Sequence, residues 1–187
     1  MLMKDELGFV VHNENEITPE LDAKIRENLC IAFPHSAWYF KDARGWKGAF
    51  PSWSVIGFDS VNNPVVHCGV VERVVTIESR PYRVFGIQNV YVLEPYRGRG
   101  LAKKLITMVV EEANRRTLDY GLLFARPHVA KLYTDLGWEL VDTKVVLQKA
   151  EDRKEFIREF EHDALYYKSM RNEKIPAGTI YFNGPDW

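Results

Sequence analysis

The sequence predicts a mixed α/β (α+β) fold, in which a central sheet of about six to seven strands is flanked by helices. Residues 53–93 contain three strand-like segments separated only by turns, which is typical of an antiparallel meander. Two helix-like segments follow, at 101–119 and 127–136, and each leads into another apolar strand. A strand joined through a helix to its neighbour runs parallel to it. The sheet is therefore expected to be antiparallel at first and parallel at its centre.

The first third of the chain reads as a strand at residues 7–12, a helix and an aromatic segment. Thr18 and Pro19 predict the start of the helix, because a threonine hydroxyl caps free N–H groups and proline suits the first helical position. The segment from Pro34 to Trp53 combines aromatic residues with glycine and proline, which fits either the wall of a pocket or a lid over the core. Its aromatic residues are Trp38, Tyr39, Phe40, Trp46, Phe50 and Trp53.

The later elements follow from the spacing of apolar and turn residues. The helix that begins at Leu101 repeats an apolar residue every four positions through Ala113, so one of its faces is expected to be buried. No linker or repeat divides the chain, which predicts a single domain over residues 1–187. The remaining predicted elements are a buried strand at 122–125, a helix from Pro127 that Gly137 stops, a strand at 138–148, a charged surface helix or loop at 151–161, and strands at 164–170 and 179–182.

Composition excludes several kinds of function. Apolar residues make up 46% of the chain and charged residues 27%, as in globular proteins. The formal net charge is −1 and no block of like charge occurs, so neither a nucleic acid nor an anionic membrane is an expected partner. Cys30, Cys68 and the five histidines lack the spacing of metal ligands, so no metal is expected. No signal peptide or membrane span is visible, and a cytoplasmic location is expected.

Residues 88–102 read as an apolar strand that breaks into a glycine and arginine turn and then opens a helix. The free N–H groups and the dipole at a helix start attract phosphate. Gly98 and Gly100 allow the backbone to approach a ligand closely, and Arg97 and Arg99 add forked donors. Two interpretations stay open on this motif alone: a diphosphate site, or an ordinary glycine-rich turn with solvated arginines.

A second motif, Leu132-Tyr133-Thr134-Asp135-Leu136-Gly137-Trp138, follows at a suitable distance. Together the two resemble the acetyl-CoA motif and the L-Y-x-x-x-G-[FW] motif of the GNAT N-acetyltransferases, and the order of elements resembles that fold over almost the whole chain. The resemblance implies acetyl-CoA as cosubstrate, Tyr133 as the catalytic acid that protonates the departing thiolate, and residues 150–187 as a C-terminal extension that completes the sheet and the acceptor site. The cofactor-binding residues that it implies are Val90, Tyr91, Val92, Arg97, Gly98, Arg99, Gly100, Leu101 and Ala102.

Two branches of that superfamily show further likeness. The segment 67–73 and the terminal Trp187 are similar to the aminoglycoside 2′-N-acetyltransferases, whereas the segment 44–51 resembles the nodulation N-acyltransferases. Both act on a sugar-borne amine, which favours an amino sugar or an aminoglycoside-like acceptor. Those aminoglycoside enzymes carry a run of acidic residues in the segment that matches 34–46, where only Asp42 is acidic here, so most counter-charges for a polycationic drug are missing. Gln88 and Phe124 also stand where they have a glutamate and a serine. The acceptor-binding residues implied are Trp38, Trp46, Gln88, Phe124 and Trp187.

The expected reaction is direct acetyl transfer to the primary amine of a small molecule, with a backbone N–H near Val92 polarising the thioester carbonyl. A general base is not assigned; the candidates are Glu72, Glu94, His67, the carboxylate of Trp187 and a chain of water molecules. Two other functions stay open: a protein or peptide N-acetyltransferase, favoured by an open aromatic groove along residues 34–53, and a non-catalytic acyl-CoA-binding module. A homodimer is also compatible with the sequence.

Overall fold

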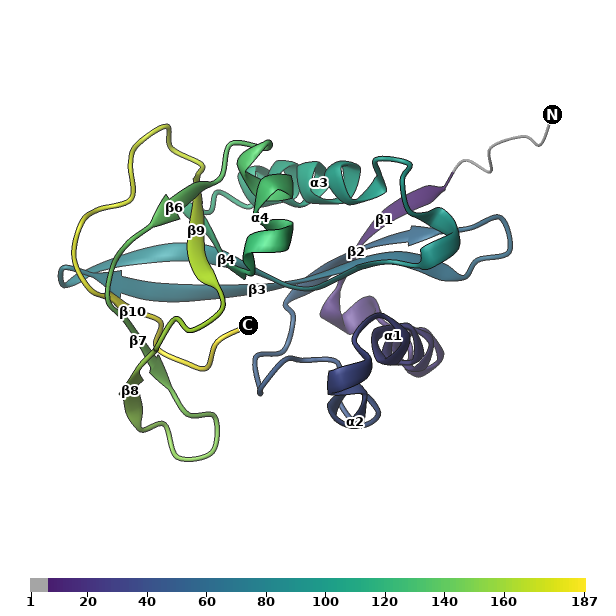
Figure 1. The fold of residues 1–187 in the computed structure, drawn as a ribbon, viewed down its shortest axis with the longest axis horizontal. Helices are drawn as coiled ribbons and strands as arrows, with labels where there is room; N and C mark the ends of the chain where they lie inside the picture. Colours follow the sequence, from purple (N-terminus) through teal and green to yellow (C-terminus); the bar gives the residue numbers. More distant parts are fainter. Residues whose placement is uncertain (1–6) are drawn as a thin grey trace.

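The computed structural model describes residues 7–187, and within that range it contains one mixed sheet of ten strands with helices on both faces (Figure 1). The helices are α1 Pro19–Ala32, α2 Ala37–Phe40, α3 Leu101–Arg115 and α4 Pro127–Thr134. The strands are β1 Gly8–Asn13, β2 Trp53–Phe58, β3 Pro64–Ile77, β4 Arg80–Val92, β5 Tyr120–Ala125, β6 Glu139–Val141, β7 Val145–Gln148, β8 Glu155–Ile157, β9 Ala164–Ser169 and β10 Ile180–Tyr181.

The sheet follows the predicted order, antiparallel first and parallel at its centre. Strands β6, β9, β5, β4, β3, β10, β7 and β8 lie in that order, while β1 pairs with β2 and β2 with the first half of β3. Strand β4 pairs with β3 antiparallel and with β5 parallel. The α+β class with a mixed sheet is thereby confirmed. Leu105, Ile106, Val109 and Ala113 are the buried residues of α3, as the four-residue spacing predicted.

The strand count exceeds the six to seven expected, for a physical reason. The run at 138–148 divides into β6, which pairs with β9, and β7, which pairs with β8 and β10. The charged segment at 151–161 was expected to form a helix or loop, yet it contains strand β8. All three residues of β8 are exposed, so the strand has no apolar alternation that the sequence could reveal.

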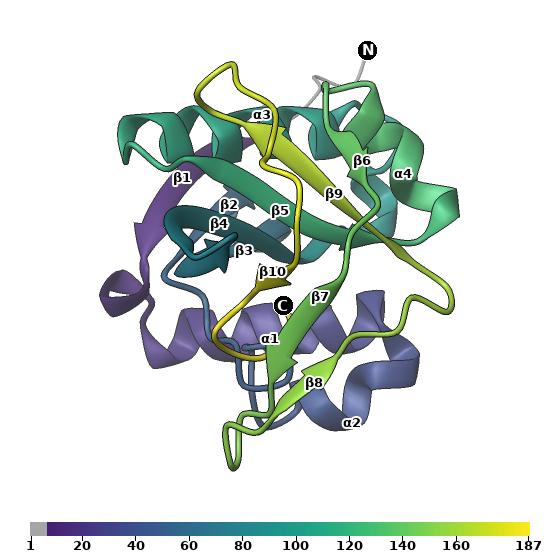
Figure 2. The ribbon, with the colours of Figure 1, turned by 90° about the vertical axis from the view of Figure 1, so that its left-hand side faces the viewer.

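The two faces of the sheet are covered differently. Helices α3 and α4 lie on one face, and α1 and α2 lie on the other at one end of the molecule (Figure 1). The rest of that second face carries β7, β8 and the C-terminal segment, and Figure 2 shows the chain end beside β7 and β10 on the α1 side. The hydroxyl of Thr18 accepts a hydrogen bond from Leu21 N at 3.2 Å, which confirms the predicted start of α1.

Candidate active site

Strands β4 and β5 separate at the centre of the sheet. They pair only through Val84–Tyr120, Phe85–Gly121 and Gly86–Leu122. Beyond that point β4 stays with β3 as far as Val92, whereas β5 stays with β9 as far as Ala125. The facing edges of the two strands therefore diverge and leave backbone groups without strand partners. Helices α3 and α4 begin just after these strands end, which is where ligands bind in many open α/β sheets.

A β-bulge lies on β4 within the diverging part. His67 pairs with Tyr91 and Gly69 with Gln88, so the single residue between them on β3 faces two residues of β4. One of the two, Asn89, has a left-handed backbone with φ of 54°. A bulge of this kind takes a residue out of the ladder and re-aims its backbone groups. The backbone N–H that was expected to polarise a thioester lies on this stretch of β4.

The bulge is held from both sides of Asn89. Its carbonyl oxygen lies 2.9 Å from Nδ1 of His67, and its side-chain amide donates to the carbonyl of Arg44 at 2.8 Å. The His67 ring also stacks on Tyr91, with 5.4 Å between the ring centroids. A strained residue persists only where its surroundings fix it, and here two separate contacts do so. The bulge is thus a preorganised feature of the folded chain.

The turn before α3 offers its N–H groups to a ligand. Gly98 and Gly100 both have φ of 74°, and a Cβ built on either would meet nothing within 4 Å. No side chain caps α3, so the first N–H groups of the helix stay open. Arg97 and Arg99 donate to carbonyls of Val92 and Pro95 at 2.9 and 3.1 Å, and within residues 7–187 neither forms an ion pair. These features fit a diphosphate.

Tyr133 is the buried residue of α4, and it belongs to the core on the α3 side of the sheet. Its side chain is 7% exposed and packs edge-on against Trp138, with 6.0 Å between the ring centroids. Burial raises the pKa of Tyr133 above its ordinary value, and the neighbouring Cys68 thiol adds to the shift. Cys68 is the β3 residue that faces the bulge. The phenol is therefore protonated at neutral pH and lies close to the backbone that would hold a thioester.

Two of the candidate bases are poorly suited to that role. His67 is fully buried, and burial lowers its pKa to about 3, so it stays neutral. The carboxylate of Glu72 accepts from the Trp53 indole at 2.8 Å and pairs with Arg116 at 3.2 Å. Neither group is free to take a proton from an incoming amine. Glu94, the carboxylate of Trp187 and a chain of water molecules remain as candidates.

The aromatic segment is anchored to β4 through Gln88. The Gln88 amide accepts from Trp46 N and donates to the carbonyl of Ala49, both at 2.8 Å. Trp46 stacks on Phe40 at 5.7 Å. Trp38, by contrast, is 72% exposed and lies on the outer side of this segment. Gln88 and Trp46 therefore sit beside the diverging strands, whereas Trp38 does not join them there.

Trp187 covers the point at which β4 and β5 separate. Its indole N–H donates to the carbonyl of Leu122 at 3.2 Å, and a Cβ on Gly86 would lie 1.9 Å from Cε2 of the indole. Arg73 holds this segment from the side, since it donates to the carbonyl of Pro185 at 2.6 Å and lies 5.0 Å from the Trp187 ring centroid. Burial lowers the pKa of Arg73 to about 10.

Gly86→Ala should displace the indole, because the added methyl cannot coexist with the ring. We expect a loss of about 1–3 kcal/mol in the free energy of unfolding, the usual cost of overpacking, measured by denaturant titration. The double variant Gly86→Ala/Trp187→Ala should recover part of that loss, since the clash disappears with the ring. Equal losses in the single and double variants would contradict this packing.

A family model described as an acetyltransferase (GNAT) domain matches residues 17–141. The chain belongs to the GNAT acetyltransferases. The matched part contains the bulge, the glycine turn and Tyr133, whereas Trp187 and strands β7 to β10 lie beyond it. No curated protein matches the sequence.

Solved structures share the GNAT fold at low identity. A GNAT family N-acetyltransferase from Escherichia coli in complex with CoA is 18% identical with a TM-score of 0.68, over 97% of this chain and 93% of that one. A GNAT acetyltransferase from Brucella melitensis in complex with acetyl-CoA is 15% identical with a TM-score of 0.59, over 92% and 94%. Arabidopsis thaliana NAA60 with a bisubstrate analogue is 14% identical with a TM-score of 0.57, over 87% and 98%.

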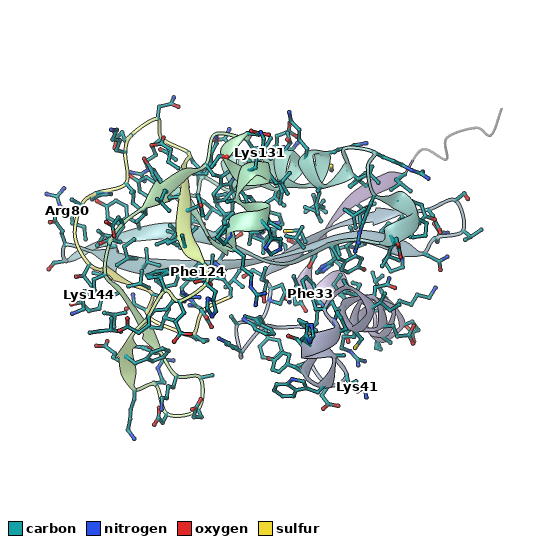
Figure 3. The ribbon with its side chains drawn as sticks, viewed as in Figure 1. Phe33, Lys41, Arg80, Phe124, Lys131 and Lys144 are labelled. Atoms are coloured by element: carbon teal, nitrogen blue, oxygen red, sulfur yellow. The ribbon has the colours of Figure 1, made fainter. Side chains whose placement is uncertain are left out.

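The predicted site residues divide between the two faces of the sheet. Val90, Val92 and Tyr133 belong to the core on the α3 side, and Phe124 and Trp187 belong to the core on the other side. Figure 3 shows Phe124 near the C-terminal segment, with Phe33 and Lys41 toward α1 and α2. The Tyr91 side chain points to α1 and donates to the carbonyl of Pro64 at 2.9 Å, so only its backbone faces the opening.

Sequence reasoning missed Asn89, whose left-handed backbone depends on pairing with β3. It also missed Asp186, whose carboxylate lies 3.3 Å from Nζ of Lys47 in the aromatic segment. No local pattern connects these two residues. Among residues 7–187, no group of three or more His, Cys, Asp or Glu residues could hold a metal ion. None of the helices in that range is both long and apolar enough to cross a membrane.

Proposed function

We propose that this GNAT protein transfers the acetyl group of acetyl-CoA to the primary amine of a small molecule, with an amino sugar as the first acceptor to test. One observation carries the proposal: the diverging β4 and β5 edges, the preorganised bulge at Asn89, the open start of α3 and Tyr133 converge on one part of the fold. Together they serve three needs of acetyl transfer, which are donor binding, carbonyl polarisation and proton donation.

Each group has a defined task in this mechanism. The N–H groups at the start of α3, with Arg97 and Arg99, bind the diphosphate of the donor. Backbone N–H groups of β4 beyond the bulge polarise the thioester carbonyl. The amine attacks that carbonyl carbon from the Trp187 face, the carbon–sulfur bond breaks, and the Tyr133 phenol donates its proton to the sulfur. Water carries the proton of the amine to solvent and returns one to Tyr133.

Contacts across the acceptor face favour a small acceptor over a peptide. A Cβ on Gly48 would lie 2.8 Å from the Cβ of Ala150, and Nζ of Lys47 lies 3.3 Å from a carboxylate oxygen of Asp186. The aromatic segment therefore meets the C-terminal part of the chain at these two contacts, which supports a closed acceptor site. We propose that residues 150–187 complete the acceptor site in this way, within a single domain.

An acceptor screen tests the proposed function. Purified protein and labelled acetyl-CoA are incubated with glucosamine, 2-phenylethylamine, spermidine and a tetrapeptide with a free N-terminus, and calorimetry measures acetyl-CoA binding in parallel. We expect binding and acetylation of a small monoamine. Label only in the peptide would replace the small-molecule acceptor with a peptide, and binding without any acceptor-dependent turnover would favour a non-catalytic module.

Removal of the Trp187 ring should weaken acceptor binding selectively. In Trp187→Ala we expect the acceptor KM to rise about tenfold, in line with the loss of an aromatic wall, while acetyl-CoA affinity changes by less than about twofold. Steady-state kinetics and calorimetry measure the two quantities, and Trp187→Phe serves as the conservative control. An unchanged acceptor KM would return Trp187 to a purely structural role.

A further inference from the structure

The tip of the aromatic segment is a tight turn with an unexpected residue in it. Ala49 N donates to the carbonyl of Trp46 at 2.7 Å, and the two central residues, Lys47 and Gly48, have φ of 45° and 85°. Two positive φ values define a type I′ turn, whose first central position favours Asn, Asp or Gly. Lysine at that position strains the backbone. An observed outlier of this kind is a reason to look for function.

The strained turn directs the Lys47 ammonium to a single carboxylate. Its Nζ lies 3.3 Å from Oδ2 of Asp186, and the Lys47 side chain remains 56% exposed. Asp186 itself is 8% exposed. The contact therefore joins a half-exposed cation to a nearly buried anion. The Lys47 ammonium also lies 5.6 Å from the centroid of the neighbouring Trp46 ring, a cation–π contact that remains available if the ion pair breaks.

Asp186 lies where the walls of the proposed acceptor site meet. Its chain neighbour Trp187 covers the separation of β4 and β5 through the Leu122 carbonyl. Its other cation is Arg158, whose Nε lies 3.6 Å from Oδ2 and whose guanidinium lies 3.9 Å from the centroid of Phe124 on β5. Lys47 connects it to the turn that Gln88 anchors on β4. Two ion pairs of its own and the indole contact of the adjacent Trp187 thus place this carboxylate between β4 and β5.

The two cations on Asp186 differ in how firmly they are held. Arg158 donates to both carboxylate oxygens of Asp163, at 3.0 and 2.8 Å, and its side chain is largely buried between Phe124 and Phe160. Lys47 has no second acidic partner among the described residues. A cationic ligand could therefore replace Lys47 while Arg158 stays in place.

We propose that Asp186 binds the ammonium form of the acceptor and that Lys47 occupies its place in the free protein. The inference rests on the proposed acetyltransferase function and specifies its acceptor class: a primary amine with one positive charge and an apolar or ring-shaped body. Phe160, which is 37% exposed, offers aromatic surface to such a body, while Arg158 and Arg73 lie on the rings of Phe124 and Trp187. Arg158 and Arg73 remain nearby as fixed cations, so a polyamine would meet repulsion.

If the proposal is right, substitutions of Lys47 and Asp186 should change the Kd of an amine ligand in opposite directions, which a purely structural ion pair would not do. Calorimetry measures the Kd of 2-phenylethylamine for the full chain, with glucosamine and spermidine for comparison, so the readout does not depend on turnover. Lys47→Met removes the competing ammonium and should tighten binding about two- to fivefold, the range of an exposed ion pair. Asp186→Asn should weaken it about tenfold or more, and the double variant should resemble Asp186→Asn.

Matched controls isolate the effect. Lys131 and Asp135 form an exposed ion pair on α4 at 2.7 Å, and Lys131→Met and Asp135→Asn should leave the Kd unchanged. Lys47→Asn relieves the strained turn and also removes the ammonium, so it should tighten binding as Lys47→Met does. Changes of the same sign in Lys47→Met and Asp186→Asn, or no binding of either monoamine to the wild type and Lys47→Met, would overturn the proposal. A failed acceptor screen with these Kd shifts intact would remove only the catalytic function.

Discussion

Tyr133→Phe should keep acetyl-CoA affinity within about twofold of wild type and lower kcat about 10²- to 10⁴-fold, the usual contribution of a positioned general acid. Phenylalanine preserves the packing of the ring against Trp138. Within residues 7–187 the Tyr133 hydroxyl has no hydrogen-bond partner, so its removal leaves no buried group unsatisfied. A lost turnover would therefore report chemistry and not unfolding.

Single-turnover measurements with saturating acetyl-CoA separate this effect from donor binding. Tyr120→Phe is a suitable control, because it removes the hydroxyl of another buried tyrosine, one that lies 3.4 Å from the carbonyl of Lys174 and away from the bulge. That control should keep kcat near the wild-type value. Full turnover in Tyr133→Phe would remove the assigned acid and leave the thiolate to be protonated by water.

The pKa shift of Tyr133 also fixes the sign of a pH effect. An ordinary tyrosine ionises at about pH 10. Burial raises the pKa of Tyr133 in the folded protein, so its phenol keeps its proton in that alkaline range. The rate should consequently rise with pH as the acceptor amine loses its proton, without an early decline caused by Tyr133. A decline of kcat between pH 8 and 9 that disappears in Tyr133→Phe would contradict the raised pKa.

Local sequence patterns predicted most of the fold. Thr18 and Pro19 located the start of α1, and the spacing from Leu101 to Ala113 gave the buried face of α3, because caps and periodicity act over a few residues. Strand β8 was not predictable from its residues, since its pairing with β7 and not a buried face decides its conformation. The same limit applies to the division of 138–148 into two strands.

The proposed donor site consists of neighbouring residues, whereas the proposed acceptor site does not. The turn from Arg97 to Gly100 is continuous in sequence, so a phosphate site there could be proposed from local residues alone. The acceptor side brings together residues more than a hundred positions apart, as Lys47 and Asp186 show. The bulge at Asn89 likewise depends on His67 and Arg44, two partners that no local pattern connects to it.

Gly100→Glu should abolish acetyl-CoA binding while leaving the fold intact. A Cβ at this position meets no protein atom within 4 Å, and the left-handed φ of 74° costs about 1 kcal/mol for any residue other than glycine. A carboxylate at the start of α3 offsets part of that cost through the helix dipole. The folded protein should therefore tolerate glutamate, and thermal unfolding should show only a small shift.

Acetyl-CoA binding should not tolerate Gly100→Glu, because the glutamate carboxylate would place a negative charge at the proposed diphosphate site. Loss of two charge-assisted hydrogen bonds, each worth about 1.5–3 kcal/mol, would raise the Kd of acetyl-CoA roughly 10²- to 10⁴-fold. Gly100→Ala carries the same backbone cost without the charge, so its Kd should stay within about tenfold of wild type. Wild-type affinity in Gly100→Glu would place the diphosphate elsewhere. An equal loss in Gly100→Ala would instead assign the effect to the backbone of the turn or to the added methyl group, since alanine adds no charge.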